Sequence, residues 1–222
     1  MTGLRLRLPP PGSLTPIDEV DPLRFYYKPL VGRLFQARIN AGLGLLDGRF
    51  RRLLEIGYGS GLLMPTLATI SDELYGADLQ PEAPGLRKVL EGMGTQVRDL
   101  VRADIQSLPF ASEHFDGVVA FSILEHLKEA ELIQAVGEVA RVLEPGGRFL
   151  VGCPAVHKAM NLAFAAIGFS NIEDHHFSGI DDVLRLCAAE FTVVRERSMP
   201  AVAGRVAPLH WAPYATVLFR KR

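Results

Sequence analysis

One acid and three alternate glycines form the segment of this sequence with the clearest chemical meaning. Glu55 is followed by Gly57, Gly59 and Gly61, with apolar residues on both sides. A glycine turn between a strand and a helix lets a ligand approach backbone N–H groups closely. The segment therefore predicts a site for a nucleotide-like ligand, because α/β proteins present such turns to nucleotides.

Three more residues of chemical interest end or directly follow later predicted strands. Asp78 closes a strand over 72–77, Asp104 follows a strand over 99–103, and Phe121 ends a strand over 115–121. The carboxyl ends of parallel strands meet at one edge of a sheet, so these side chains are expected near the glycine turn. The alternatives are an exposed turn or helix cap for each aspartate and a plain core residue for Phe121.

A general base has one favoured candidate, His126, because it follows the fourth predicted strand at the same edge as the glycine turn. A histidine considered alone is more often a surface residue than a catalytic one. The two cysteines, Cys153 and Cys187, are neither closely spaced nor next to histidine clusters. We interpret them as reduced core residues, and no metal site is predicted.

The composition is that of an ordinary globular protein. The chain has 222 residues, of which 48% are hydrophobic and 22% charged, and its formal charge is −1. This favours one domain with a small appendage and gives no sign of a nucleic-acid partner. The longest mostly apolar segment, 161–169, is too short to span a membrane, and the N-terminus lacks a signal-peptide pattern. A cytoplasmic protein is expected; the oligomeric state is not predicted.

The elements that must position these residues begin after a proline-rich N-terminal stretch. Residues 23–46 show apolar spacing typical of one or two helices, so we expect an N-terminal arm and helical lid over 1–46 and a ligand-binding domain over 47–222. The rest alternates between strands and helices, with one helix expected over 62–70 and a longer one, from about Leu132, that Pro145-Gly146-Gly147 should end. Strands are expected at 51–56, 72–77, 99–103, 115–121, 148–153, 191–196 and 214–220.

This alternation predicts a doubly wound, Rossmann-like seven-stranded sheet between two helical layers, a three-layer α/β/α sandwich. The last two strands have no helix between them, so the last strand should be antiparallel. The loop that joins them, 199–213, should then overhang the ligand. We expect His210 and Trp211 in this loop to bind an acceptor molecule, with Tyr27 opposite, although a lone tryptophan is as often a plug over the core.

Five motifs in order resemble those of the class I S-adenosylmethionine-dependent methyltransferases, specifically the methyltransferase type 11 family. They are the glycine turn with Glu55, Asp78, the Ala103-Asp104-Ile105 segment, the segment LPFASEHFDGVVAFSILEHL and the segment LEPGGRFLV. The resemblance covers about 53–154 closely and the remainder loosely. It implies S-adenosylmethionine as cofactor and S-adenosylhomocysteine as product.

The resemblance also implies a role for each motif residue. Glu55 would attract the amino group of the methionine moiety, and the glycine turn would hold its carboxylate. Asp78, followed by Leu79, would accept hydrogen bonds from both ribose hydroxyls. Asp104 and Ile105 would hold the adenine, and Phe121 would pack beside the adenine or the methyl group.

Two alternatives to a methyltransferase stay open. The first is an S-adenosylmethionine-binding module without catalysis, and the second is a nicotinamide-dependent Rossmann oxidoreductase. The second is disfavoured because Leu62 stands where the dinucleotide fingerprint has its third glycine. For a methyltransferase, the sequence lacks the motifs of DNA-base methylases, so a small-molecule acceptor is preferred. The atom that would be methylated is not predicted.

Overall fold

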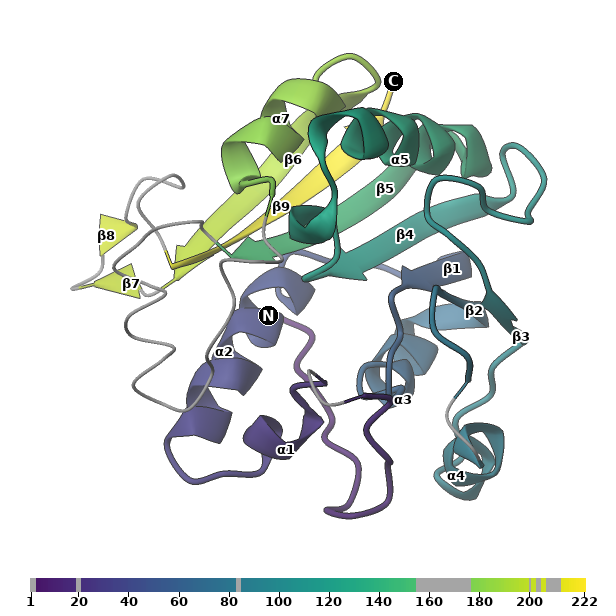
Figure 1. The fold of residues 1–222 in the computed structure, drawn as a ribbon, viewed down its shortest axis with the longest axis vertical. Helices are drawn as coiled ribbons and strands as arrows, with labels where there is room; N and C mark the ends of the chain where they lie inside the picture. The colour runs from purple at the N-terminus through teal and green to yellow at the C-terminus, as the bar shows by residue number, and fades with distance from the viewer. Residues whose placement is uncertain are drawn as a thin grey trace.

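The computed structural model describes residues 3–18, 21–82, 85–154, 177–199, 201–202, 205–206 and 213–222. Its centre is a seven-stranded sheet with the order β3-β2-β1-β4-β5-β9-β6 (Figure 1). The strands are β1 (Phe50–Ile56), β2 (Ser71–Asp78), β3 (Asp99–Arg102), β4 (Phe115–Phe121), β5 (Leu143–Pro154), β6 (Phe191–Met199) and β9 (Tyr214–Lys221). A separate short pair joins β7 (Ala201–Val202) to β8 (Arg205–Val206).

The direction of the strands confirms the predicted fold class. Strands β1 to β5 pair in parallel, whereas β9 is antiparallel to both of its neighbours, β5 and β6. Strand β6 therefore runs in the same direction as β1 to β5. As a result, the carboxyl ends of six strands meet at one edge of the sheet, as the sequence analysis expected.

Helices cover both faces of the sheet and complete the three layers (Figure 1). One face carries α5 (Glu129–Val142) and α7 (Ile180–Cys187), and the other carries α1 (Leu23–Tyr26), α2 (Val31–Leu43), α3 (Met64–Leu67) and α4 (Leu86–Gly92). Each face has its own apolar core. Successive residues of a strand point to opposite faces, so Leu53 packs in one core and Leu54 in the other.

Two helix boundaries differ from the sequence-based expectation. The helix expected over 62–70 is α3 followed by a 3-10 turn, η1 (Ala68–Ile70), with Pro65 in the first turn of α3. The expectation that Pro145-Gly146-Gly147 ends the long helix is wrong. The helix α5 ends at Val142, because Leu143 is already extended and pairs with Phe115 of β4.

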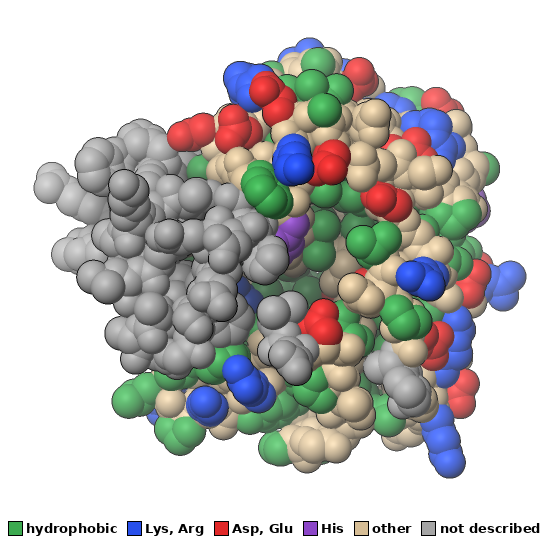
Figure 2. All heavy atoms as spheres, in the orientation of Figure 1, with side chains coloured by type: hydrophobic (Ala, Val, Ile, Leu, Met, Phe, Trp, Pro, Cys, Tyr) green, Lys and Arg blue, Asp and Glu red, His purple; other side chains and the backbone are tan. Residues whose placement is uncertain are grey.

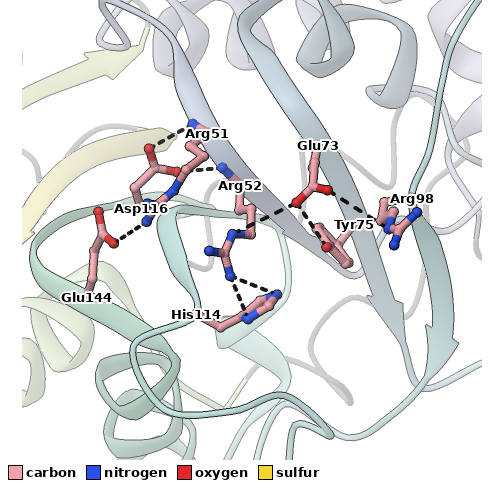
Figure 3. Close-up of polar contacts among 8 residues, drawn as sticks. All are labelled: Arg51, Arg52, Glu73, Tyr75, Arg98, His114, Asp116 and Glu144. Carbon is pink, nitrogen blue, oxygen red and sulfur yellow. Dashed lines mark hydrogen bonds and ion pairs between the residues drawn. The ribbon is translucent and has the colours of Figure 1, made fainter.

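A polar network joins the beginnings of the strands at the edge opposite the glycine turn (Figure 3). The Asp116 carboxylate accepts hydrogen bonds from the backbone N–H groups of Arg51 (2.8 Å) and Arg52 (2.9 Å). The Arg52 guanidinium donates to Nδ1 of His114 at 2.8 Å. Partial burial and the Arg52 charge lower the pKa of His114. This network therefore stabilises the β1–β4 pairing and favours a neutral His114.

The N-terminal arm contacts helices on one face of the sheet. The Leu6 backbone N–H donates to Oδ1 of Asn40 in α2 at 2.7 Å, and the Arg7 N–H donates to Oγ1 of Thr66 in α3 at 2.9 Å. Leu14, Leu23 and Phe25 belong to the apolar core of that face. The arm is thus packed against the sheet domain, and the expected division into 1–46 and 47–222 stays a prediction.

Candidate active-site cavity

The glycine turn after β1 has a backbone conformation that favours glycine at each of its three positions. The φ angles are 72° for Gly57, 51° for Gly59 and 80° for Gly61, in the left-handed region. A Cβ at Gly57 would overlap the Ile123 side chain, and one at Gly61 would lie 2.7 Å from Leu86. A Cβ at Gly59 would only make an ordinary contact with Ile17 at 3.8 Å, and Gly59 lines the cavity described below, so its backbone is accessible to a ligand.

Asp78, at the end of β2, organises this turn. Its Oδ2 accepts a hydrogen bond from the Gly59 N–H at 2.7 Å, and its Oδ1 accepts one from the Gln80 N–H at 2.8 Å. Ionised acceptors form stronger hydrogen bonds than neutral ones. Asp78 therefore has a structural role in the turn. Each carboxylate oxygen also keeps acceptor capacity for a ligand.

Glu55, near the end of β1, carries a carboxyl group without full hydrogen bonding. The residue is 3% exposed, and among the described residues its Oε2 has no hydrogen-bond partner. Burial, and then the negative charge of Asp78, raise the pKa of Glu55 well above its usual range. Leaving a buried acceptor unpaired is costly. A cationic donor in the adjacent cavity would satisfy this atom and favour the ionised form.

These groups share one cavity of about 600 Å³ at the carboxyl ends of the strands. Figure 2 shows a hollow on this face, with acidic side chains around it and a histidine at its wall. The cavity is lined by residues from the glycine turn, the ends of β2 and β4, and the N-terminal helices. Its volume is in the range of cavities that hold small molecules and cofactors.

Most of the predicted site residues line this cavity. They are Glu55, Gly57, Gly59, Asp78, Leu79, Asp104, Ile105, Phe121 and His126. Gly61 does not line it and instead packs against Leu86. Tyr27 also does not line it: its hydroxyl donates to the Pro9 carbonyl at 3.0 Å, and the neighbouring Tyr26 takes its place at the wall. His210 and Trp211 lie outside the described residues.

Asp104 fits both interpretations that the sequence left open. Its Oδ1 accepts a hydrogen bond from the Gln106 N–H at 2.9 Å, which is a local turn, and its backbone bridges to Ser107. The same residue lines the cavity with Ile105, which is buried. The turn therefore fixes the carboxylate at the wall, beside an apolar side chain.

Arg38 of α2 is a cavity residue that the sequence analysis missed. Its Nη2 donates to the Tyr26 hydroxyl at 3.2 Å, and its guanidinium lies 4.4 Å from the centre of the Phe35 ring. Its buried Nε has no hydrogen-bond partner, and no ion pair involves Arg38 in the described part of the chain. A signal exists in the sequence, because Arg38 falls on the same helix face as the buried Phe35, Ile39 and Gly42.

A second missed group surrounds the end of β4. Ser122, which lines the cavity, has a φ of 56°, and its Oγ lies 3.2 Å from the Tyr214 hydroxyl of β9. Glu125, three residues further along the chain, carries a buried carboxyl group, since the residue is 1% exposed. Burial raises the pKa of Glu125 to about 8, although its own backbone, the Arg38 charge and Ser122 oppose this shift. Its Oε2 has no hydrogen-bond partner within the described residues.

The fold and the cavity together define a class of protein. A doubly wound sheet whose last strand enters antiparallel between β5 and β6, with a glycine turn after β1, is the class I methyltransferase fold. Residues 54–151 match the family model described as a methyltransferase domain. Residues 54–151 are thus similar to a methyltransferase domain, and the predicted resemblance is confirmed.

Two solved structures illustrate the fold at low sequence identity. The N-methyltransferase NodS from Bradyrhizobium japonicum WM9, in complex with S-adenosylhomocysteine, is 20% identical with a TM-score of 0.65, covering 92% of this chain and 94% of NodS. The cyclase SpnF is 21% identical with a TM-score of 0.60, covering 86% of this chain and 80% of SpnF. At such identities the likeness establishes the fold alone.

Two curated relatives share the label ubiquinone biosynthesis O-methyltransferase. The Cereibacter sphaeroides protein (strain ATCC 17029) is 28% identical over 161 residues, which are 72% of this chain and 62% of the relative. The Bradyrhizobium sp. (strain ORS 278) protein is 29% identical over 143 residues, which are 64% of this chain and 54% of the relative. The chain therefore spans less than two thirds of the length of these relatives.

Two further properties concern only the described part of the chain. None of the helices there has the length and apolar character needed to cross a membrane. No group of three or more metal-ligating side chains occurs within the same residues.

Proposed function

We propose that this protein is an S-adenosylmethionine-dependent methyltransferase that acts on a small-molecule acceptor. One observation carries the proposal: the cavity brings together an accessible glycine turn and a buried Glu55 oxygen without a partner. S-adenosylmethionine carries an ammonium group that fits the unpaired carboxyl oxygen. When bound, the cofactor supplies a methyl group on a sulfonium, which transfers by in-line displacement.

The residues of the cavity suit the parts of this cofactor. Glu55 would accept hydrogen bonds from the amino group, and Arg38, the only arginine among the lining residues described, would bind the methionine carboxylate. Asp78 would accept hydrogen bonds from the ribose hydroxyls while it keeps those from the backbone N–H groups of Gly59 and Gln80. Asp104 and Ile105 would hold the adenine, with Leu79 at the cavity mouth, where it is 60% exposed.

A hydroxyl group is the favoured methyl acceptor. The curated relatives named above are described as O-methyltransferases, which supports oxygen, whereas NodS is described as an N-methyltransferase. His126 at the cavity wall stays the sequence-based candidate for a base. Acceptor contacts by Tyr27, His210 and Trp211 also stay predictions, as do a helical lid over 1–46 and a cytoplasmic location.

Ligand binding tests the proposal without knowledge of the acceptor. S-adenosylmethionine and S-adenosylhomocysteine should raise the melting temperature, since a ligand that binds only the folded state stabilises it. NAD should have no effect. Stabilisation by NAD and not by either methionine cofactor would instead support the oxidoreductase alternative and refute the proposal.

Methyl transfer separates an enzyme from a binding module. Labelled S-adenosylmethionine should transfer its methyl group to at least one compound of a panel that contains catechols, simple phenols and amino sugars. Cofactor binding without transfer to any of these would favour the non-catalytic alternative. This assay is needed because SpnF, whose fold is similar, is described as a cyclase.

A further inference from the structure

Two exposed leucines lie where the chain passes from α1 into α2. Leu30 is 77% exposed, the largest value among the exposed large apolar side chains of the described residues, and Leu34 is 50% exposed. Leu30 directly precedes α2, and Leu34 lies one turn further along, since its N–H donates to the Leu30 carbonyl at 3.3 Å. Residues four apart at such a turn lie on the same side of a helix. The two leucines therefore form one exposed apolar patch.

The backbone at Leu30 is unfavourable for a leucine. Its φ is 62° and its ψ is −62°, and the Val31 N–H donates to the Pro29 carbonyl at 2.7 Å, which makes Leu30 the centre of a strained γ-turn. Leu30 is also the N-cap of α2, where it makes no capping hydrogen bond and where small polar residues or glycine are preferred. Because the side chain is exposed, packing does not offset these costs. Local costs without a structural gain are found mainly at functional positions.

Basic side chains lie beside the two leucines. Arg24, Lys28 and Arg33 are exposed, and none of the three forms an ion pair within the part of the chain that the structure describes. The Arg24 guanidinium lies 4.9 Å from the centre of the Phe25 ring, and Nζ of Lys28 lies 4.8 Å from the same centre. Arg33 follows Leu30 by three residues, so it lies on the same side of α2. Three unpaired positive charges therefore border the apolar patch.

The sequence around the patch contains no negative charge. The segment 22–46 includes these three basic residues and Arg38 but no Asp or Glu. The first turn of α2 has no acidic residue either, so its own side chains do not neutralise the partial positive charge of the helix N-terminus. Figure 2 shows hydrophobic and basic side chains next to each other at the lower left, where Figure 1 places α1 and α2. The patch is thus complementary to a partner that combines negative charge with an apolar interior.

From these observations we propose that the α1–α2 corner, which consists of Arg24, Lys28, Leu30, Arg33 and Leu34, docks on the surface of a bilayer that contains anionic phospholipids. The leucines would enter the boundary between head groups and acyl chains, and the basic side chains would contact lipid phosphates. Such a contact is peripheral and requires no membrane-spanning helix. This inference goes beyond the proposed function and does not depend on it.

A protein partner fits the α1–α2 corner less well than a bilayer does. In a two-fold dimer of this chain the same patch faces itself, so the three basic residues would repel their own copies. A different protein with an acidic surface would need a matching area of about 800 Å² on each side for a stable complex. Two leucine side chains form only a small part of such an area. A bilayer needs no matching shape, so a small apolar patch is sufficient.

Docking through the α1–α2 corner would keep the cavity close to the membrane. Arg38, which lines the cavity, follows Leu30 by eight residues along α2. At a rise of about 1.5 Å per residue, this separation is about 12 Å along the helix. Leu23 and Tyr26 of α1 also line the cavity. The docked protein would therefore hold its candidate active site a short distance from the bilayer surface.

Co-sedimentation with vesicles tests the docking. One set of vesicles contains phosphatidylglycerol and phosphatidylcholine in equal parts, and the other contains phosphatidylcholine alone. We expect the wild-type protein to bind the anionic set at least about tenfold more tightly, because each basic residue near an anionic membrane contributes about fivefold. Added salt should weaken this binding, since it screens the charges.

Variants of the two leucines separate docking from folding. Leu30→Gly relieves the positive φ and suits the N-cap, so it should unfold at the same temperature as the wild type or above it. The same variant should bind anionic vesicles about tenfold more weakly, because it removes an exposed leucine. Leu34→Gln should also bind them more weakly. Its matched control is Ile133→Gln in α5, on the other face of the sheet, where Ile133 is 53% exposed; this variant should bind like the wild type.

A matched pair of lysines tests the contribution of charge. Lys28 and Lys128 are both exposed, and each lies over a phenylalanine ring, at 4.8 and 5.4 Å from its centre. Lys28→Gln should weaken binding to the anionic vesicles by about fivefold. Lys128 is the N-cap of α5, outside the α1–α2 corner, so Lys128→Gln should bind like the wild type.

The outcomes decide the proposal. Tighter binding to anionic vesicles that Leu30→Gly and Lys28→Gln weaken, and that neither control changes, supports it. The proposal is overturned if the wild-type protein binds neither set of vesicles, binds both sets equally, or binds no better than Leu30→Gly. A dimer in sedimentation that Leu30→Gly dissociates, without vesicle binding, would also overturn it and make the corner an interface between copies.

Cofactor affinity keeps this test separate from the proposed function. Calorimetry should give the same S-adenosylhomocysteine affinity for the wild-type protein and all five variants, because none of the substituted residues lines the cavity. A wild-type protein that docks on anionic vesicles but does not bind S-adenosylhomocysteine would refute the proposed function and support the docking surface. Normal cofactor binding without docking would do the reverse.

Discussion

Asp78 offers the sharpest test of how this cavity is built, because its carboxylate stabilises the glycine turn and, in the proposed function, would also bind the ribose of the ligand. Its two bonds to the N–H groups of Gly59 and Gln80, at 2.7 and 2.8 Å, are charge-assisted. Hydrogen bonds to charged groups contribute about 1.5–3 kcal/mol each. Water can replace part of this in an open cavity, so we expect Asp78→Ala to cost about 2–3 kcal/mol of stability without ligand.

The expected readings follow from these energies. For a domain of this size, 1 kcal/mol corresponds to about 2–4 °C, so the melting temperature should fall by about 4–12 °C. Loss of the ribose bonds should weaken S-adenosylhomocysteine binding by about a hundredfold or more. Asp78→Asn keeps one carbonyl acceptor and should give a smaller loss of stability. Calorimetry and thermal unfolding, each with and without ligand, measure both effects.

A control variant lies at the other end of the same strand. Asp72 is the second residue of β2, and within the described residues its side chain forms only an exposed ion pair with Arg49. Such pairs contribute roughly 0–1 kcal/mol, so Asp72→Ala should change neither property by much. Unchanged ligand affinity in Asp78→Ala would show that Asp78 does not contact the ribose. An unchanged melting temperature without ligand would show that its bonds to the turn are not stabilising.

Three further predictions concern groups whose environments are defined above. Folding raises the pKa of Glu55, so the contribution of this residue to stability is full at low pH and is lost as pH rises. The melting temperature of the wild-type protein should therefore fall with rising pH, and Glu55→Gln should make this dependence weaker. The same variant should bind S-adenosylhomocysteine less tightly. Folding lowers the pKa of His114, so the contribution of this residue to stability is lost as pH falls below about 6.5. In acid unfolding curves, His114→Gln should lack this loss of stability. Gly57→Ala should abolish S-adenosylhomocysteine binding, because the new Cβ would overlap the Ile123 side chain. The control Gly94→Ala has nearly the same φ but open space beside it, so it should lose only stability. Equal ligand binding by both variants would show that the overlap with Ile123 does not matter.

The sequence predicted the sheet and most of the residues that line the cavity because these features are local. Each strand is a short apolar run, and each acid follows its strand directly, so the edge at which Asp78 and Asp104 meet follows from the parallel direction alone. The hydrogen bonds by which Asp78 holds the glycine turn were not predicted. A role in ribose binding alone would leave the melting temperature of Asp78→Ala without ligand nearly unchanged, but the carboxylate also accepts a hydrogen bond from the Gly59 N–H.

The group around Ser122 could not be predicted because it joins distant parts of the chain. Arg38 comes from α2, Ser122 from the end of β4 and Tyr214 from the start of β9, and only the packing of these elements brings them together. The neighbours Tyr26 and Tyr27 show the same limit, although an acceptor contact by Tyr27 stays a prediction. Tyr26 is the last residue of α1 and Tyr27 its C-cap, and only Tyr26 lines the cavity.

The place of β9 inside the sheet has a consequence for synthesis of the protein. Strand β6 pairs only with β9 among the described strands, and β5 needs β9 to cover its second edge. At about 5–20 residues per second, the ribosome completes β9 about 1–4 s after β6. During this interval the apolar edge of β5 is open to pairing with other chains. Aggregation of nascent protein should therefore depend on how quickly the last strand arrives, and a faster translation rate over 200–221 should reduce it.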